Sequence, residues 1–111
     1  MILADVVTAV GGLTEVAQWR RGLSAGGGSL GVTPGVEPFV LAGLPVPVVA
    51  VTATGRQAEE MQDALRDLGR TVGVFPSWET LPHERLSPTA DTVGRRMAVI
   101  ADVAAGELPD V

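Results

Sequence analysis

The sequence predicts an α/β fold: a parallel sheet of about three strands, flanked by helices and incomplete at its C-terminal end. Stretches of apolar, β-branched residues alternate with stretches of helical period, which favours parallel strands joined by right-handed crossovers. Residues 46–52 are almost continuously apolar, as expected for a parallel strand covered on both faces. The chain of 111 residues is 46% hydrophobic, which is enough for one core.

The first 28 residues are expected to form two helices and a glycine-rich loop ahead of this sheet. Residues 3–10 are apolar enough for a helix that ends at Gly11 and Gly12. A second helix is indicated by apolar residues at helical spacing, namely Leu13, Val16, Ala17 and Leu23. Residues 24–29 contain three consecutive glycines and predict a loop. The α/β part is then expected to cover residues 29–111.

A strand, a helix and a second strand are predicted next. Residues 29–33 suit a short strand. The helix is expected to open at Pro34 or Gly35 and to end at Leu44, because Pro45 follows. The apolar run at 46–52 forms the second strand.

The following helix has clear start and stop signals. Thr54 and Gln57 have the spacing of a capping box, and Gly69 lies where the helix should end. Its apolar stripe consists of Ala58, Met61, Leu65 and Leu68. Residues 71–75 predict the third strand.

The last part of the chain predicts a long loop and one more helix. Residues 76–90 have no period and contain three prolines. Asp91 can cap the last helix, which Gly106 and Pro109 should end. The inward stripe of this helix is expected to be Val93, Met97, Ile100, Ala101 and Ala104. Because a βαβ pattern requires another strand at this point, we expect the chain to be the first part of a larger α/β domain.

Composition and charge argue against several classes of function. The net charge of −5 disfavours nucleic-acid binding driven by phosphate neutralisation. The chain has no cysteine and one histidine, so disulfides, thiolate zinc sites and histidine-rich metal sites are excluded. Prolines interrupt the uncharged run at 38–55, which disfavours a membrane span. Since no positive region precedes the apolar N-terminal residues, we expect a cytoplasmic protein without a signal peptide.

Gly26, Gly28 and Gly31 have the spacing G-x-G-x-x-G of a dinucleotide-binding loop. That loop must follow a strand and open a helix, because the pyrophosphate rests on the helix N-terminus. Here the glycines follow a predicted helix and precede a predicted strand. A flexible loop is the better interpretation.

The turn at residues 31–38 lies between a predicted strand and a predicted helix, where a phosphate-binding loop belongs. Gly31 fits the first position of G-x-x-x-x-G-K-[ST], whereas Val36 replaces the second glycine. Glu37 stands where lysine would neutralise phosphates, and Pro38 stands where Ser or Thr would bind magnesium. Because a carboxylate repels phosphates and proline has no hydroxyl, we predict no nucleotide, metal or other cofactor for this chain. An ordinary turn explains the one matching glycine equally well.

The loop at 76–90 offers candidate catalytic and binding residues. Glu79 and Glu84 permit a carboxylate pair, and Ser87 with His83 permits a Ser/His/acid arrangement, but no G-x-S-x-G motif is present. Packing of the loop onto the sheet, anchored by Trp78 and Leu81, is the default, and a partner-binding Trp78 is the alternative. The pairs Arg20-Arg21 and Arg95-Arg96 could contact phosphates, although solvation is favoured.

The segment F-P-S-W-E-T-L-P-H-E-R-L-S-P at residues 75–88 closely resembles the W-E-T-L-P-x-E…S-P signature of bacterial transcription-repair coupling factors (Mfd). D-T-V-G-R-R-M at 91–97 is similar to the next helix of that family, and residues 48–58 are similar to its second strand and helix. The resemblance covers residues 13–108. Its signature and possible interface residues are Trp78, Glu79, Thr80, Leu81, Pro82, Glu84, Ser87, Pro88, Arg95 and Arg96.

The resemblance implies the first part of a UvrB-like module with a P-loop/RecA-like sheet. In the family this module is a degenerate copy that does not use ATP, which agrees with Glu37 and Pro38. The parent protein it implies displaces stalled RNA polymerase with a DNA translocase driven by ATP and magnesium, and recruits UvrA. The implied partners are the rest of the parent chain and, through the parent, UvrA, RNA polymerase and DNA, but no membrane.

We therefore expect a scaffold and interaction module without its own chemistry, from the N-terminal region of a transcription-repair coupling factor. Two alternatives stay open. One is a small nucleotide-dependent α/β enzyme that uses the loop after the third strand, and the other is an independent adaptor that binds a protein through the Trp78 loop.

Overall fold

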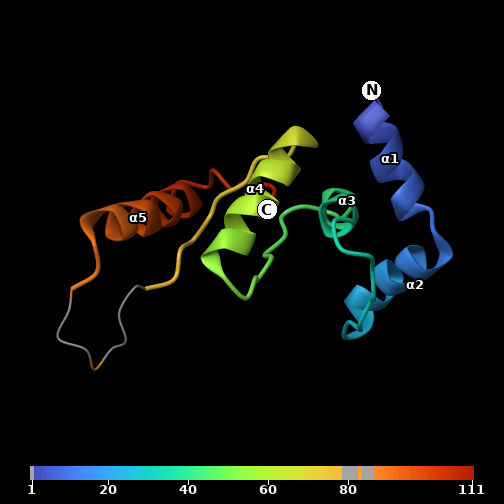
Figure 1. Cartoon of the computed structure of the whole chain (residues 1–111), viewed down its shortest axis with the longest axis horizontal. Helices are drawn as coiled ribbons and strands as arrows, with labels where there is room; N and C mark the ends of the chain where they lie inside the picture. Colours follow the sequence, from blue (N-terminus) through green and yellow to red (C-terminus); the bar gives the residue numbers. More distant parts are fainter. Residues whose placement is uncertain (1, 79–82, 84–86) are drawn as a thin grey trace.

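The computed structural model describes residues 2–78, 83 and 87–111 (Figure 1). The helices are α1 (Ile2–Gly11), α2 (Thr14–Gly22), α3 (Glu37–Ala42), α4 (Gly55–Asp67) and α5 (Ala90–Ala104), and a 3₁₀ turn follows α2 at Leu23–Ala25. Helices α1 to α3 lie at one end of the molecule, α5 lies at the other, and α4 lies between them. In this part of the chain no helix is both long and apolar enough to cross a membrane.

The predicted α/β fold with a P-loop/RecA-like parallel sheet is wrong, because the described residues contain helices and no β-strand. The irregular segments at 46–52 and 71–75 bond instead to Asp110 and Val111. The Val48 N–H donates to the Asp110 carbonyl at 2.8 Å, and the Val111 N–H donates to the Thr71 carbonyl at 3.1 Å. Among the described residues these bonds do not build a ladder between strands. The predicted strands were residues 29–33, 46–52 and 71–75.

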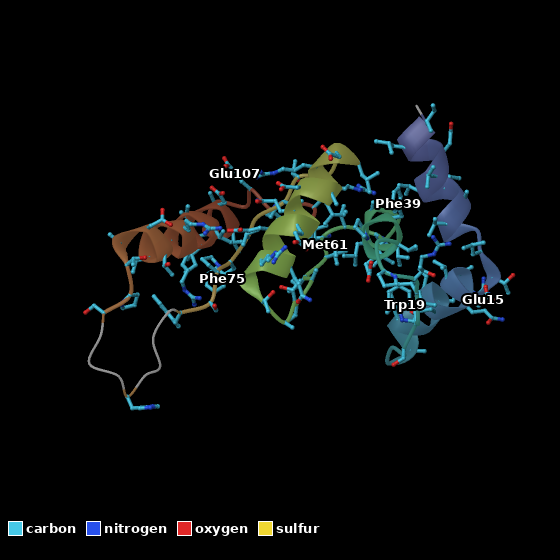
Figure 2. The ribbon with its side chains drawn as sticks, viewed as in Figure 1. Glu15, Trp19, Phe39, Met61, Phe75 and Glu107 are labelled. Carbon is cyan, nitrogen blue, oxygen red and sulfur yellow. The ribbon has the colours of Figure 1, made fainter. Side chains whose placement is uncertain are left out.

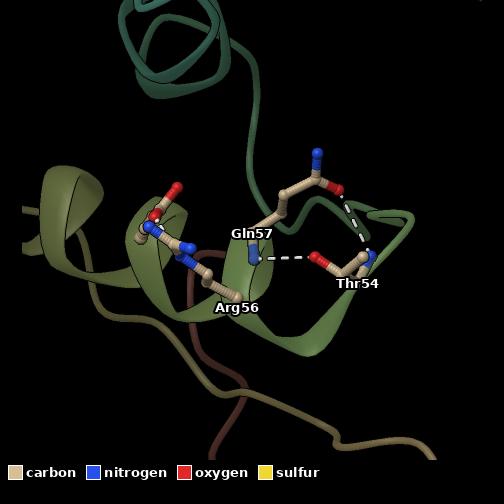
Figure 3. Close-up of polar contacts among 4 residues, drawn as sticks. Thr54, Arg56 and Gln57 are labelled. Atoms are coloured by element: carbon tan, nitrogen blue, oxygen red, sulfur yellow. Dashed lines mark hydrogen bonds and ion pairs between the residues drawn. The ribbon is translucent and has the colours of Figure 1, made fainter.

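The predicted boundaries of α4 are confirmed. The Gln57 N–H donates to the Thr54 hydroxyl at 3.2 Å, and the Thr54 N–H donates to Gln57 Oε1 at 3.2 Å (Figure 3). Gly69 has φ +83°, the left-handed conformation that commonly ends a helix. Both ends of this helix follow from the chemistry of a few neighbouring residues.

Two other helices begin at different residues from those predicted. α3 begins only at Glu37, because Gly35 has φ +93° in the turn before it. α5 begins at Ala90, and Thr89 is its N-cap: the Thr92 N–H donates to the Thr89 hydroxyl at 3.3 Å. Asp91, the predicted cap, lies in the first turn, where its negative charge still complements the helix dipole.

The core is small and lies where α3 packs against α1 and α4. Leu65 of α4 is fully buried, and Arg70 donates to the Ala42 carbonyl at 3.1 Å, which ties the end of α4 to α3. The radius of gyration is 16.1 Å, whereas a compact domain of this size has about 13 Å. The buried hydrophobic residues in the described part of the chain are Val16, Val40, Ala42, Leu44 and Leu65.

The predicted inward stripe of α5 is also wrong. Its residues Val93, Met97, Ile100, Ala101 and Ala104 are all exposed. The helix instead turns its other side to the chain: Thr92 is buried, and Arg95, Arg96 and Val99 are partly buried. Without a sheet to cover the apolar stripe, the arginine side packs against the extended chain before the loop.

Candidate functional site

The turn that resembles a phosphate-binding loop bonds to itself. The Gly35 N–H donates to Glu37 Oε2 at 2.8 Å, and the Val36 N–H donates to the Thr33 carbonyl at 3.1 Å. Phosphate-binding loops direct such backbone N–H groups at the ligand. In this turn the chain's own carboxylate and carbonyl accept both hydrogen bonds.

The charge of Glu37 adds to this effect. Its carboxylate lies in the first turn of α3, where a negative charge is favourable, and a phosphate placed there would meet it directly. Pro38 lies in the same turn and contributes neither an N–H nor a hydroxyl. The structure therefore brings Glu37 and Pro38 together in the first turn of α3. There the Glu37 carboxylate supplies the negative charge that a bound phosphate would otherwise supply.

The other glycine pattern forms the end of the 3₁₀ turn. Gly26 and Gly27 have φ of +109° and +85°, which side chains other than glycine rarely adopt. The Trp19 indole N–H donates to the Gly28 carbonyl at 3.2 Å, so the loop folds back on α2. Irregular chain and no helix follows it, which agrees with a loop and not with a dinucleotide site.

Arg96 forms the principal contact at the base of the loop. Its guanidinium carbon lies 3.9 Å from the centroid of the Phe75 ring and 4.1 Å from that of the Trp78 ring. The same group donates to the Pro76 carbonyl. Phe75 lies beside α5 in Figure 2. These contacts, which we call the arginine stack, join the chain before the loop to α5.

Both aromatic residues of the arginine stack are about half exposed: Phe75 is 49% exposed and Trp78 is 51% exposed. The neighbouring Arg95 lies 3.7 Å from Glu59 of α4 in an exposed ion pair. Surface pairs of this kind contribute little to stability. Because it stacks on both rings, Arg96 is a packing residue, whereas the sequence favoured solvation for both Arg95 and Arg96.

The remaining predicted loop residues are not brought together into a described site. His83 and Ser87 are exposed, and Pro88 is partly buried. Among the residues that the structure describes, no cluster of His, Asp and Glu is placed to hold a metal ion. Five predicted residues lie outside the described part of the chain, namely Glu79, Thr80, Leu81, Pro82 and Glu84.

Sequence reasoning missed the arginine stack, although the sequence carries a signal for it. Of four aromatic residues in the chain, Phe75 and Trp78 lie three positions apart, shortly before a helix with two adjacent arginines. Arginine stacks readily on aromatic rings. The pattern does not say which of Arg95 and Arg96 turns inward.

The fold and these contacts define a class: a small helical module with a turn that bonds to itself and an arginine stack at the base of a loop. Over 59 residues the chain is 52% identical to the transcription-repair-coupling factors of Mycobacterium bovis (strain ATCC BAA-935 / AF2122/97) and Mycobacterium tuberculosis (strain CDC 1551 / Oshkosh). The predicted resemblance to transcription-repair coupling factors is therefore confirmed for this stretch.

The match covers 52% of this chain and 5% of each relative. The chain thus corresponds to a small part of those proteins. No family model matches the chain, and no solved structure matches it.

Proposed function

We propose that the chain is an interaction module of a transcription-repair coupling factor and performs no nucleotide chemistry itself. The observation that carries this proposal is the hydrogen bond from the Gly35 N–H to Glu37. A phosphate-binding turn needs free N–H donors and a cation, and here a carboxylate takes the donor and supplies the opposite charge.

The proposal includes a longer parent protein, supported by the 52% identity to the mycobacterial coupling factors. The parent couples transcription to excision repair: an ATP- and magnesium-dependent DNA translocase displaces stalled RNA polymerase, and UvrA is recruited. The module contacts the rest of the parent chain and reaches UvrA, polymerase and DNA through it. A cytoplasmic location belongs to the same proposal.

A titration with a fluorescent ATP analogue and magnesium tests the absence of nucleotide binding. We expect no saturable signal from the chain, while a protein with an intact phosphate-binding loop saturates under the same conditions. The variant Glu37→Gln keeps the shape of the side chain and removes its charge. This variant should also give no saturable signal, because no lysine or hydroxyl replaces the missing ligands.

Two outcomes of this titration are informative in the other direction. Magnesium-dependent binding of micromolar affinity by the unaltered chain would refute the proposal. Binding by Glu37→Gln alone would show that the carboxylate is the single barrier, and that the turn otherwise keeps a phosphate site.

A second candidate function is an adaptor that binds a protein through the loop. The exposed half of Trp78 favours it, because tryptophan is enriched among residues that dominate binding energy at interfaces. The third candidate, a nucleotide-dependent α/β enzyme, was predicted on a sheet that the described residues do not form.

A further inference from the structure

A groove lies between α2 and the irregular segment that follows the 3₁₀ turn. Its volume is about 500 Å³, within the range of ligand-binding pockets. Two hydrogen bonds hold its walls together: the Trp19 indole N–H donates to the Gly28 carbonyl at 3.2 Å, and the Gly27 N–H donates to the Gly22 carbonyl at 2.9 Å. We call it the α2 groove; one wall is residues 27–31, and the other consists of Glu15, Gln18, Trp19 and Gly22.

The helical wall of the α2 groove carries a carboxylate and an aromatic ring. Glu15 and Trp19 are four positions apart on α2, so their side chains are neighbours on one side of the helix (Figure 2). The two arginines of α2 do not line the groove. Arg20 turns to α1, where a Cβ added at Gly11 would lie 3.5 Å from Arg20 Nη1, and Arg21 is exposed. The charge in the groove is therefore the negative charge of Glu15.

Gly22 leaves the α2 groove open beside the ring of Trp19. Its φ of −73° and ψ of −16° are helical values that any residue adopts, and an added Cβ would meet no atom within 4 Å. Neither the backbone nor the packing requires glycine at this position, in contrast to the positive φ of Gly26 and Gly27. The consequence of glycine here is unfilled space next to an aromatic ring and a carboxylate.

We propose that the α2 groove binds an arginine side chain of a partner protein. A guanidinium stacks on an aromatic ring with its face and donates two hydrogen bonds to a carboxylate with its edge, so it uses Trp19 and Glu15 together. The chain contains one contact of the same kind, because Arg96 stacks on Trp78. The α2 groove offers an indole and a carboxylate to an arginine from outside the chain.

The open shape of the groove favours a side chain of a protein over a free small molecule. Sites for small molecules enclose most of the surface of the ligand. Here Glu15, Gln18 and Gly28 are all exposed, so the groove covers the end of one long side chain while the backbone of the partner stays outside. This inference does not depend on the proposed function, because it rests on α2 and residues 27–31 alone.

Titration of the full chain with the blocked peptide acetyl-Gly-Arg-Gly-amide, followed by NMR, tests the proposal. We expect the indole N–H signal of Trp19 to shift, with a dissociation constant on the order of millimolar for a single arginine. The chain has two tryptophans, and Trp78→Phe identifies which signal belongs to which. The same peptide with citrulline keeps the shape of arginine without its charge, and it should bind at least about tenfold more weakly.

Two variants test whether binding takes place in the α2 groove. Glu15→Gln removes the charge and should weaken binding by about fivefold or more. Gly22→Leu fills the space beside Trp19 and should abolish the shift, while leucine suits a helix better than glycine does. The matched control is Glu60→Gln, which makes the same change at an exposed carboxylate of α4 and should leave binding unchanged. Circular dichroism verifies that each variant keeps its helices.

Four results would overturn the proposal. They are no shift of the Trp19 signal at about 50 mM peptide, equal binding of the citrulline peptide, equal weakening by Glu15→Gln and Glu60→Gln, and undiminished binding by Gly22→Leu. Free arginine separates a protein partner from a small molecule: its own carboxylate meets Glu15, so it should bind more weakly than the blocked peptide. Free arginine that binds about tenfold more tightly than the peptide would overturn the assignment to a protein.

Discussion

The guanidinium of Arg96 lies between two aromatic rings and donates to the Pro76 carbonyl. Arginine suits this position because its planar group stacks on rings while its edge still donates hydrogen bonds. Lysine would keep the charge but could not stack in the same way. The arginine stack therefore fixes Trp78 at the base of the loop while leaving half of that side chain accessible.

Trp78→Ala separates a packing role from a binding role. If the ring mainly packs on Arg96, the free energy of unfolding should fall by about 1–2 kcal/mol, because a cation–π contact and partly buried apolar area are lost. Arg96→Lys, which keeps the charge, should reproduce part of that loss. Urea denaturation followed by circular dichroism measures both. Unchanged stability of both variants, together with lost binding to a protein partner, would favour the adaptor function.

At the scale of elements, α4 was predictable and the strands were not. The capping box of α4 involves Thr54 and Gln57 alone, so a local pattern suffices to predict it. A strand, in contrast, needs a hydrogen-bonded neighbour from elsewhere in the chain. The apolar runs at 46–52 and 71–75 have no regular secondary structure, and backbone hydrogen bonds link Val48 to Asp110 and Thr71 and Gly73 to Val111.

The capping box gives a prediction for α4. Thr54→Ala removes the oxygen that accepts from the Gln57 N–H, and it should lower the free energy of unfolding by about 1 kcal/mol. Thr54→Ser keeps that oxygen and should stay within about 0.5 kcal/mol of the unaltered chain. Thermal melts of the three proteins at one concentration measure the difference. Equal melting temperatures for Ala and Ser would show that the cap does not limit stability.

At the scale of the whole molecule, periodicity predicted the α5 helix but not which side of it faces the rest of the chain. The stripe from Val93 to Ala104 has the spacing of a buried face, yet a spacing cannot show whether another element is present to cover it. The turn before α3 was more tractable: Glu37 and Pro38 already contradict phosphate binding by their chemistry. Only the structure shows that Glu37 accepts from the Gly35 N–H.

The elongated shape and small core predict that the free energy of unfolding depends only weakly on urea concentration. The slope of unfolding free energy against urea scales with the surface exposed on unfolding, and typical small proteins show about 1–3 kcal/mol per molar. Because the described part of the chain has only five buried hydrophobic residues, we expect a slope at or below about 1 kcal/mol per molar. Leu65→Ala should lower the midpoint by removing a fully buried side chain, with little change in slope. A slope near about 2 kcal/mol per molar would mean that the monomer buries far more apolar surface than an extended chain with an uncovered α5 can provide.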